Sequence, residues 1–141
     1  IPVAMRSEIK QLQGRMILAD YYNANPASME AALAALAGMN AGKRIAVLGD
    51  MLELGSFSEE AHRAVGAAAA RLGIDVLITL GNRAANIAEG ALVAGMLRQQ
   101  VHTTTEHREA AELMKKHTAP GDAVLIKGSR GMRMEKILEE F

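Results

Sequence analysis

Short runs of apolar residues alternate in this chain with longer segments of helical periodicity, and this alternation limits the folds that the chain can adopt. The runs cover residues 16–20, 44–49, 75–80 and 122–127, and residues 100–103 are predicted as a further short strand. Unbroken apolar runs are typical of strands buried on both faces of a mostly parallel sheet, and the segments between them have the length of crossover helices. We therefore predict an α/β fold of the doubly wound class, with helices on both faces of the sheet.

The first part of the chain departs from this pattern. Residues 7–12 alternate weakly through Ile9 and Leu12, and Gln13-Gly14 is a turn signal. We predict a short edge strand that forms an antiparallel hairpin with residues 16–20. Residues 1–6 contain Pro2 and small residues and are interpreted as a linker, which leaves residues 7–141 as a single domain.

Helix boundaries follow from capping signals. Asn25 before Pro26 predicts a helix start, and Met29, Ala32, Leu33 and Leu36 lie on one face of that helix. Further helices are expected after a capping box at Ser56 and Glu59 (or an N-cap at Ser58), over residues 84–94, after a capping box at Thr103 and Glu106, and over the C-terminal residues with Met134, Ile137, Leu138 and Phe141.

Composition excludes several classes of protein. Sixteen basic residues balance sixteen acidic ones, which disfavours a nucleic-acid or anionic-membrane binder. The chain has no Cys and no apolar run of bilayer length, so we expect a cytoplasmic protein without disulfides or membrane insertion. It opens on Ile1 without an initiator Met, as expected for a piece of a larger protein.

Polar residues follow three of the predicted parallel strands, at residues 20–25, 50–53 and 127–130. Because the carboxyl ends of parallel strands share one edge of a sheet, we expect these three stretches to converge, and that edge is where open α/β sheets bind ligands. In the first stretch, Tyr22, Asn23 and Asn25 are candidates to meet a nucleotide, a metal-bound water or a substrate. The alternative is a turn in which Asn25 only caps the helix.

The second and third stretches offer charged groups. Asp50 and Glu53 are candidate catalytic residues: Asp50 would accept a hydrogen bond from an amine or hydroxyl, and Glu53 would cap the next helix or pair with a cation. The alternative is that both are structural. His62 is interpreted as a partly exposed helical residue. Lys127, Ser129 and Arg130 lie in a glycine-containing loop and are the strongest candidates to bind a carboxylate or phosphate, with Lys127 also a catalytic candidate. Ser129 is alternatively a helix cap.

Several motifs are absent. The sequence has no P-loop, no G-x-G-x-x-G fingerprint, no G-x-S-x-G elbow and no H-E-x-x-H pair. If the protein uses a nucleoside triphosphate, another domain must therefore hold most of its phosphates.

Three motifs together resemble the C-terminal domain of the Mur ligases. They are Asp-Tyr-Tyr-Asn-Ala-Asn-Pro at residues 20–26, Leu-Gly-Asp-Met-Leu-Glu-Leu-Gly at residues 48–55, and Ile-Lys-Gly-Ser-Arg at residues 126–130. The resemblance covers nearly the whole chain. It implies a Rossmann-like three-layer sandwich of about six strands, mostly parallel with one antiparallel edge strand, preceded in the full protein by a UDP-sugar domain and an ATP-binding domain.

The first two motifs resemble most closely the family member that adds D-alanyl-D-alanine to UDP-N-acetylmuramoyl-tripeptide. The implied reaction uses ATP and Mg²⁺, held mainly by the absent central domain, and proceeds through an acyl phosphate. Tyr22, Asn23 and Asn25 would then face the nucleotide, and Lys127, Ser129 and Arg130 would hold the dipeptide carboxylate or a phosphate oxygen. A monomer without turnover as an isolated domain is expected, and no metal ligand is assigned here.

Two rival interpretations remain at this stage. The chain is alternatively a non-catalytic Rossmann-like ligand-binding module, which predicts ligand binding by the isolated chain. It is alternatively an interaction domain that docks through its polar edge, which predicts that substitutions at Asn23 and Lys127 leave ligase kinetics unchanged.

Overall fold

A computed structural model describes residues 8–141, so the predicted linker at residues 1–6 lies outside the described part. Six strands form one sheet: β1 (Glu8–Leu12), β2 (Arg15–Asp20), β3 (Arg44–Gly49), β4 (Val76–Leu80), β5 (Val101–Thr104) and β6 (Ala123–Lys127). The helices are α1 (Pro26–Ala37), α2 (Ser58–Arg71), α3 (Ala85–Val93), α4 (His107–His117) and α5 (Lys136–Glu139). Short 3-10 turns lie at η2 (Gly55–Phe57), η3 (Arg98–Gln100) and η4 (Arg130–Met132).

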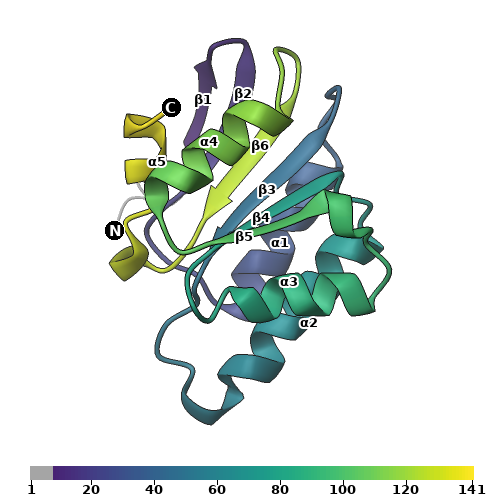
Figure 1. The fold of residues 1–141 in the computed structure, drawn as a ribbon, viewed down its shortest axis with the longest axis vertical. Coiled ribbons are helices and arrows are strands. Elements are labelled where there is room, and N and C mark those ends of the chain that lie inside the picture. The colour runs from purple at the N-terminus through teal and green to yellow at the C-terminus, as the bar shows by residue number, and fades with distance from the viewer. Residues whose placement is uncertain (1–7) are drawn as a thin grey trace.

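The strand order in the sheet is β1-β2-β6-β3-β4-β5. β1 pairs antiparallel with β2, and all the other neighbouring pairs are parallel. This arrangement confirms the predicted fold class and the predicted edge hairpin. It also places β2, β6 and β3 side by side, so the three polar stretches follow three adjacent strands (Figure 1).

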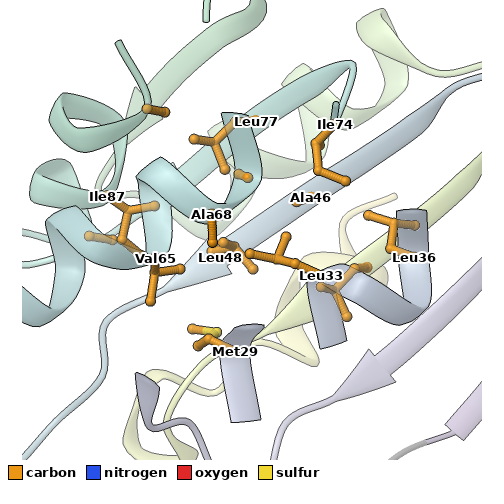
Figure 2. Packing of buried hydrophobic residues seen from close by; sticks show 14 of the residues in the cluster. Met29, Leu33, Leu36, Ala46, Leu48, Val65, Ala68, Ile74, Leu77 and Ile87 are labelled. Carbon is orange, nitrogen blue, oxygen red and sulfur yellow. The ribbon is translucent and has the colours of Figure 1, made fainter. Parts of the chain in front are cut away.

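Helices cover both faces of the sheet. One core cluster joins α1, α2 and α3 to the side chains of one face, and a second joins α4 and α5 to the other face. Figure 2 shows the first cluster, in which Met29, Leu33 and Leu36 of α1 gather with residues of α2, β3 and β4. Both clusters are almost entirely aliphatic, as expected for a chain with only four Phe and Tyr residues in total.

Helices α2 and α3 approach each other unusually closely because each has a glycine in the contact. A Cβ atom built on Gly66 would lie 1.9 Å from the carbonyl oxygen of Ile87, and one built on Gly90 would lie 2.1 Å from that of Arg63. By helix propensity alone, Gly90 weakens the helix predicted over residues 84–94. In the structure it allows backbone-to-backbone packing that no larger residue permits.

The capping predictions are confirmed at one helix and wrong at two. The Asn25 side chain accepts a hydrogen bond from the Ser28 amide, and Ser28 returns one, so α1 begins with a capping box. Within the described chain no side chain caps α2, because η2 runs directly into it from Gly55. Before α4 it is Thr104, not Thr103, whose hydroxyl accepts from the Glu106 amide.

The C-terminal helix is shorter than predicted. Residues 130–132 form a 3-10 turn, and Arg133 then adopts a left-handed conformation with φ of 50°. A helix cannot continue through that conformation, so α5 is limited to Lys136–Glu139. Met134 and Ile137 are nevertheless buried in the second core cluster, as the predicted apolar face requires.

No helix formed by residues 8–141 has the length and apolar character that a membrane crossing demands.

Two stacked histidines are expected to make the stability of the fold sensitive to acid. The rings of His102 and His117 lie with their centroids 4.2 Å apart, and burial lowers the pKa of both below the ordinary value of 6.5. The neighbouring Lys116 and, for His117, His102 and Lys43 lower the pKa further, while a backbone hydrogen bond partly opposes the shift at His102. The unfolded chain therefore takes up protons before the folded chain as the pH falls below 6.5.

For this reason we expect the melting temperature to decrease as the pH is lowered from about 7.5 to about 5.5. A double variant, His102→Phe with His117→Phe, keeps two stacked rings but has no titratable nitrogens. Its melting temperature should decrease less over the same pH interval. Differential scanning calorimetry at the two pH values measures both slopes. Parallel slopes for the two proteins would show that the histidine pair does not carry the effect.

Candidate functional site

The loops after β2, β6 and β3 form one polar rim at the carboxyl edge of the sheet. The loops after β2 and β3 lead into α1 and α2 on one face, whereas the loop after β6 leads into α5 on the opposite face. Loops that diverge to opposite faces open a crevice at the carboxyl ends of parallel strands. We call the residues of these loops, 20–25, 50–53 and 127–133, the rim.

Lys127, the last residue of β6, contacts the loop after β2. Its side chain is only 1% exposed, and its Nζ donates to the Asp20 carboxylate at 2.5 Å and to the Asn23 backbone oxygen at 2.9 Å. Lys127 therefore fixes the loop after β2 from the neighbouring strand β6. These contacts use two of its three donors, so its predicted roles as ligand and catalytic group depend on the third.

Tyr22 and Arg130 meet across the rim. The Arg130 guanidinium carbon lies 5.5 Å from the centroid of the Tyr22 ring, which is within cation–π distance. Tyr22, predicted to contact a nucleotide, and Arg130, predicted to bind an anion, are thus neighbours. They follow β2 and β6, whose last residues, Asp20 and Lys127, are 107 positions apart in the sequence. Arg130 is exposed and lines an open hollow of about 430 Å³ with Gly131, Arg133 and Glu135.

The remaining candidates after β2 have different surroundings. Asn23 is exposed at the rim. The Oδ1 atom of Asn25 accepts from the Ser28 amide at 2.9 Å, so its capping role is confirmed and any nucleotide contact would fall to Nδ2. Tyr21 belongs to the same loop but packs against the second core cluster, and burial raises its pKa to about 12.

Ser129 joins the loop after β6 to the loop after β3. Its hydroxyl oxygen accepts from the Leu52 amide at 2.8 Å, and its own amide donates to the Asp50 carbonyl oxygen at 3.0 Å. The alternative role of helix cap is wrong, since none of the described side chains caps η4. Its role toward a substrate stays a prediction.

The Asp50 carboxylate is the buried part of the rim and holds the start of α3. It is 4% exposed, its Oδ1 accepts from the Ala84 amide at 2.7 Å, and its Oδ2 lies 3.6 Å from Arg83. A carboxylate is favoured there by the unpaired amides of the helix N-terminus. These contacts support the structural alternative for Asp50, while Glu53 is exposed and adopts a left-handed conformation with φ of 64°.

His62 is not partly exposed, as the sequence suggested, but fully buried. Its Nε2 accepts a hydrogen bond from the Met51 amide at 3.0 Å, and its Nδ1 lies 2.6 Å from the Ser58 carbonyl oxygen. The Met51 amide belongs to the segment that connects β3 to α2, whereas Ser58 is the first residue of α2 itself. Burial is possible because both ring nitrogens have backbone partners.

Two features of this edge were missed from the sequence. Arg133 adds a second cation to the hollow beside Arg130, but its left-handed conformation carries no sequence signal. A second open hollow, of about 350 Å³, lies beyond the ends of β4 and β5. It is lined by Gly81, Asn82, Ala85, Thr103, Thr104, Thr105 and Glu109, and the run of three threonines was the available signal.

Comparison with known proteins identifies the class that this fold and rim define. The sequence profile of the Mur ligase glutamate ligase domain matches residues 5–130. The chain therefore belongs to the Mur ligase family, and it corresponds to the glutamate ligase domain of that family.

Two curated relatives from different bacteria carry the name of the same member of the Mur ligase family. The chain is 41% identical over 139 residues to the UDP-N-acetylmuramoyl-tripeptide–D-alanyl-D-alanine ligase of Bacillus subtilis, covering 97% of this chain and 30% of that protein. It is 35% identical over 130 residues to the ligase of the same name from Escherichia coli, covering 92% of this chain and 27% of that protein. The chain thus spans less than a third of the length of these relatives.

Two solved structures of MurF ligases match nearly the whole of this chain. The MurF ligase of Thermotoga maritima, solved in complex with ADP, matches with a TM-score of 0.81 and 27% identity, over 100% of this chain and 30% of that one. A MurF structure from Acinetobacter baumannii matches with a TM-score of 0.82 and 28% identity, over 99% of this chain and 30% of that one.

Proposed function

We propose that this chain is the C-terminal domain of an ATP-dependent ligase that joins D-alanyl-D-alanine to UDP-N-acetylmuramoyl-tripeptide in peptidoglycan precursor synthesis. The observation that carries the proposal is the meeting of Tyr22 and Arg130 across the rim. It places an aromatic ring, suited to a nucleotide base, beside a guanidinium group, suited to a carboxylate or phosphate. The identity to ligases of that activity over 97% of the chain supports the same reaction.

The rim would serve the reaction by positioning. In the proposed sequence, ATP phosphorylates the terminal carboxylate of the tripeptide, the amine of the dipeptide attacks the acyl phosphate, and phosphate leaves. Tyr22, Asn23 and Asn25 would contact the nucleotide, while Ser129 and Arg130 would hold the carboxylate of the dipeptide. Closing this domain over the rest of the protein would bring the amine to the acyl phosphate and exclude water from it.

The phosphates of ATP and the accompanying Mg²⁺ would be held mainly by the central domain of the full protein. Residues 8–141 contain no group of three or more His, Asp or Glu side chains arranged to hold a metal ion. We therefore assign no step of this domain to the metal. We further propose that the protein is cytoplasmic and monomeric, and that the isolated domain has no ligase turnover.

Arg130→Ala in the full-length ligase tests the proposal. Loss of a charge-assisted contact to the dipeptide carboxylate should raise the Michaelis constant for D-alanyl-D-alanine by about tenfold or more. Steady-state kinetics with each substrate varied in turn measure the change. Arg108→Ala is the matched control, because Arg108 is an exposed arginine of α4 that pairs with Glu140 at 3.1 Å. Unchanged Michaelis constants for both the dipeptide and ATP would remove Arg130 from the site.

A further inference from the structure

His62 is a buried histidine that has no role in the reaction proposed above. It lies on α2 and reaches back to the loop after β3, where it accepts from the Met51 amide at 3.0 Å. An amide can only donate and a carbonyl can only accept, so the contacts at Met51 and Ser58 place the proton of the ring on Nδ1. With both nitrogens bound to backbone groups, His62 is not available as a base or a metal ligand.

The segment that His62 holds is also held from its other side. Leu52 donates its amide to the Ser129 hydroxyl, and the Asp50 carbonyl oxygen accepts from the Ser129 amide. Residues 50–52 are thus fixed between α2 and the loop after β6. Without such contacts the segment would be hard to maintain, since Glu53 next to it adopts a left-handed conformation that residues other than glycine rarely adopt.

The same contacts connect His62 to the rim. Ser129 is followed directly by Arg130, which lies over Tyr22 on the far side of β6. A displacement of residues 50–52 would change the support of Ser129 and, through it, the placement of Arg130. The connection runs through hydrogen bonds of 2.8 to 3.0 Å and two steps along the backbone, from Met51 to Leu52 and from Ser129 to Arg130.

We propose that His62 is a positioning residue, which fixes residues 50–52 so that Ser129 and Arg130 are held in the orientation that binds the dipeptide carboxylate. The proposal rests on the function proposed above for the rim. It assigns to His62 no contact with a substrate.

Two amide variants in the full-length ligase separate the contact of Nε2 with Met51 from the contacts of Nδ1 with Ser58. His62→Asn places an amide near the position of Nδ1, so it keeps the contact with Ser58 and loses the one with Met51. His62→Gln reaches the position of Nε2 and keeps an acceptor for the Met51 amide. We expect His62→Asn to raise the Michaelis constant for D-alanyl-D-alanine about tenfold, with that for ATP changed less than about twofold, and His62→Gln to stay within about threefold of wild type.

Leu36→Ala is the control for general loss of stability, because Leu36 is fully buried near the end of α1 that lies away from the rim. It should lower the melting temperature and leave both Michaelis constants unchanged. Equal effects of His62→Asn and His62→Gln on the Michaelis constant for the dipeptide, or an effect of Leu36→Ala as large as theirs, would overturn the proposal.

Hydrogen exchange measured by mass spectrometry gives a readout that does not depend on activity. The amides of Met51 and Leu52 should be protected in the wild-type protein and should exchange faster in His62→Asn but not in His62→Gln. Unprotected amides in the wild type would overturn the proposal even if His62→Asn does not fold. A wild-type protein without ligase turnover would instead overturn the proposed function, while the exchange would still decide whether His62 fixes the loop.

Discussion

Lys127→Met is expected to lower the free energy of unfolding by about 3 to 5 kcal/mol, because it removes one partner of a buried ion pair. The Lys127 side chain is 1% exposed and that of its partner Asp20 is 17% exposed. Methionine fills a similar volume but leaves the Asp20 carboxylate and the Asn23 carbonyl without their cation. Urea denaturation of the wild-type and variant chains measures the difference.

A double variant distinguishes the ion pair from a simple packing effect. Asp20→Asn combined with Lys127→Met removes both charges, so it should cost less than the sum of the two single substitutions. Lys136→Met is the matched control, since Lys136 is exposed on α5 and its replacement should change stability by less than about 0.5 kcal/mol. Additive single effects would contradict a coupled pair.

Gly66→Ala is expected to destabilise the fold by about 3 kcal/mol, although alanine is the better helix former. Helix propensity favours the alanine by about 1 kcal/mol. The added Cβ would lie 1.9 Å from the Ile87 carbonyl oxygen and 2.6 Å from the Ala91 amide, and both are backbone atoms of α3 that cannot rotate away. Forcing the two helices apart should therefore outweigh the gain in propensity.

Gly38→Ala provides the control for this prediction. Gly38 has an ordinary φ of −84°, and the nearest atoms to an added Cβ lie 3.7 Å away. Its replacement should leave thermal stability unchanged or raise it slightly, because the unfolded chain loses conformational freedom. A Gly66→Ala protein that melts at the wild-type temperature would show that α2 and α3 can separate without cost.

Much of the fold could be predicted because the sequence carries its signals locally. The unbroken apolar runs predict β2, β3, β4 and β6, the dipeptide Gln13-Gly14 predicts the hairpin, and Asn25-Pro26 predicts the start of α1. Convergence of the three polar stretches followed from the rule that parallel strands share one carboxyl edge. Each of these inferences uses neighbours in sequence or a general property of sheets.

The surroundings of individual polar side chains could not be predicted, because they depend on residues far away in the sequence. Nothing near Lys127 indicates that Asp20 would neutralise it from 107 positions away. Nothing near His62 shows that the Met51 amide would reach its buried ring. Gly66 and Gly90 are similar: each is an ordinary helix-weakening residue by sequence, and only the packing of α2 on α3 explains it.

A crystal structure of the full-length ligase with a non-hydrolysable ATP analogue and D-alanyl-D-alanine would test most directly whether the rim is one binding site. We predict that Tyr22 and Asn23 contact the nucleotide and that Arg130 lies within hydrogen-bond distance of the dipeptide carboxylate. The account would be contradicted if neither ligand contacts any of residues 20–25 or 127–133.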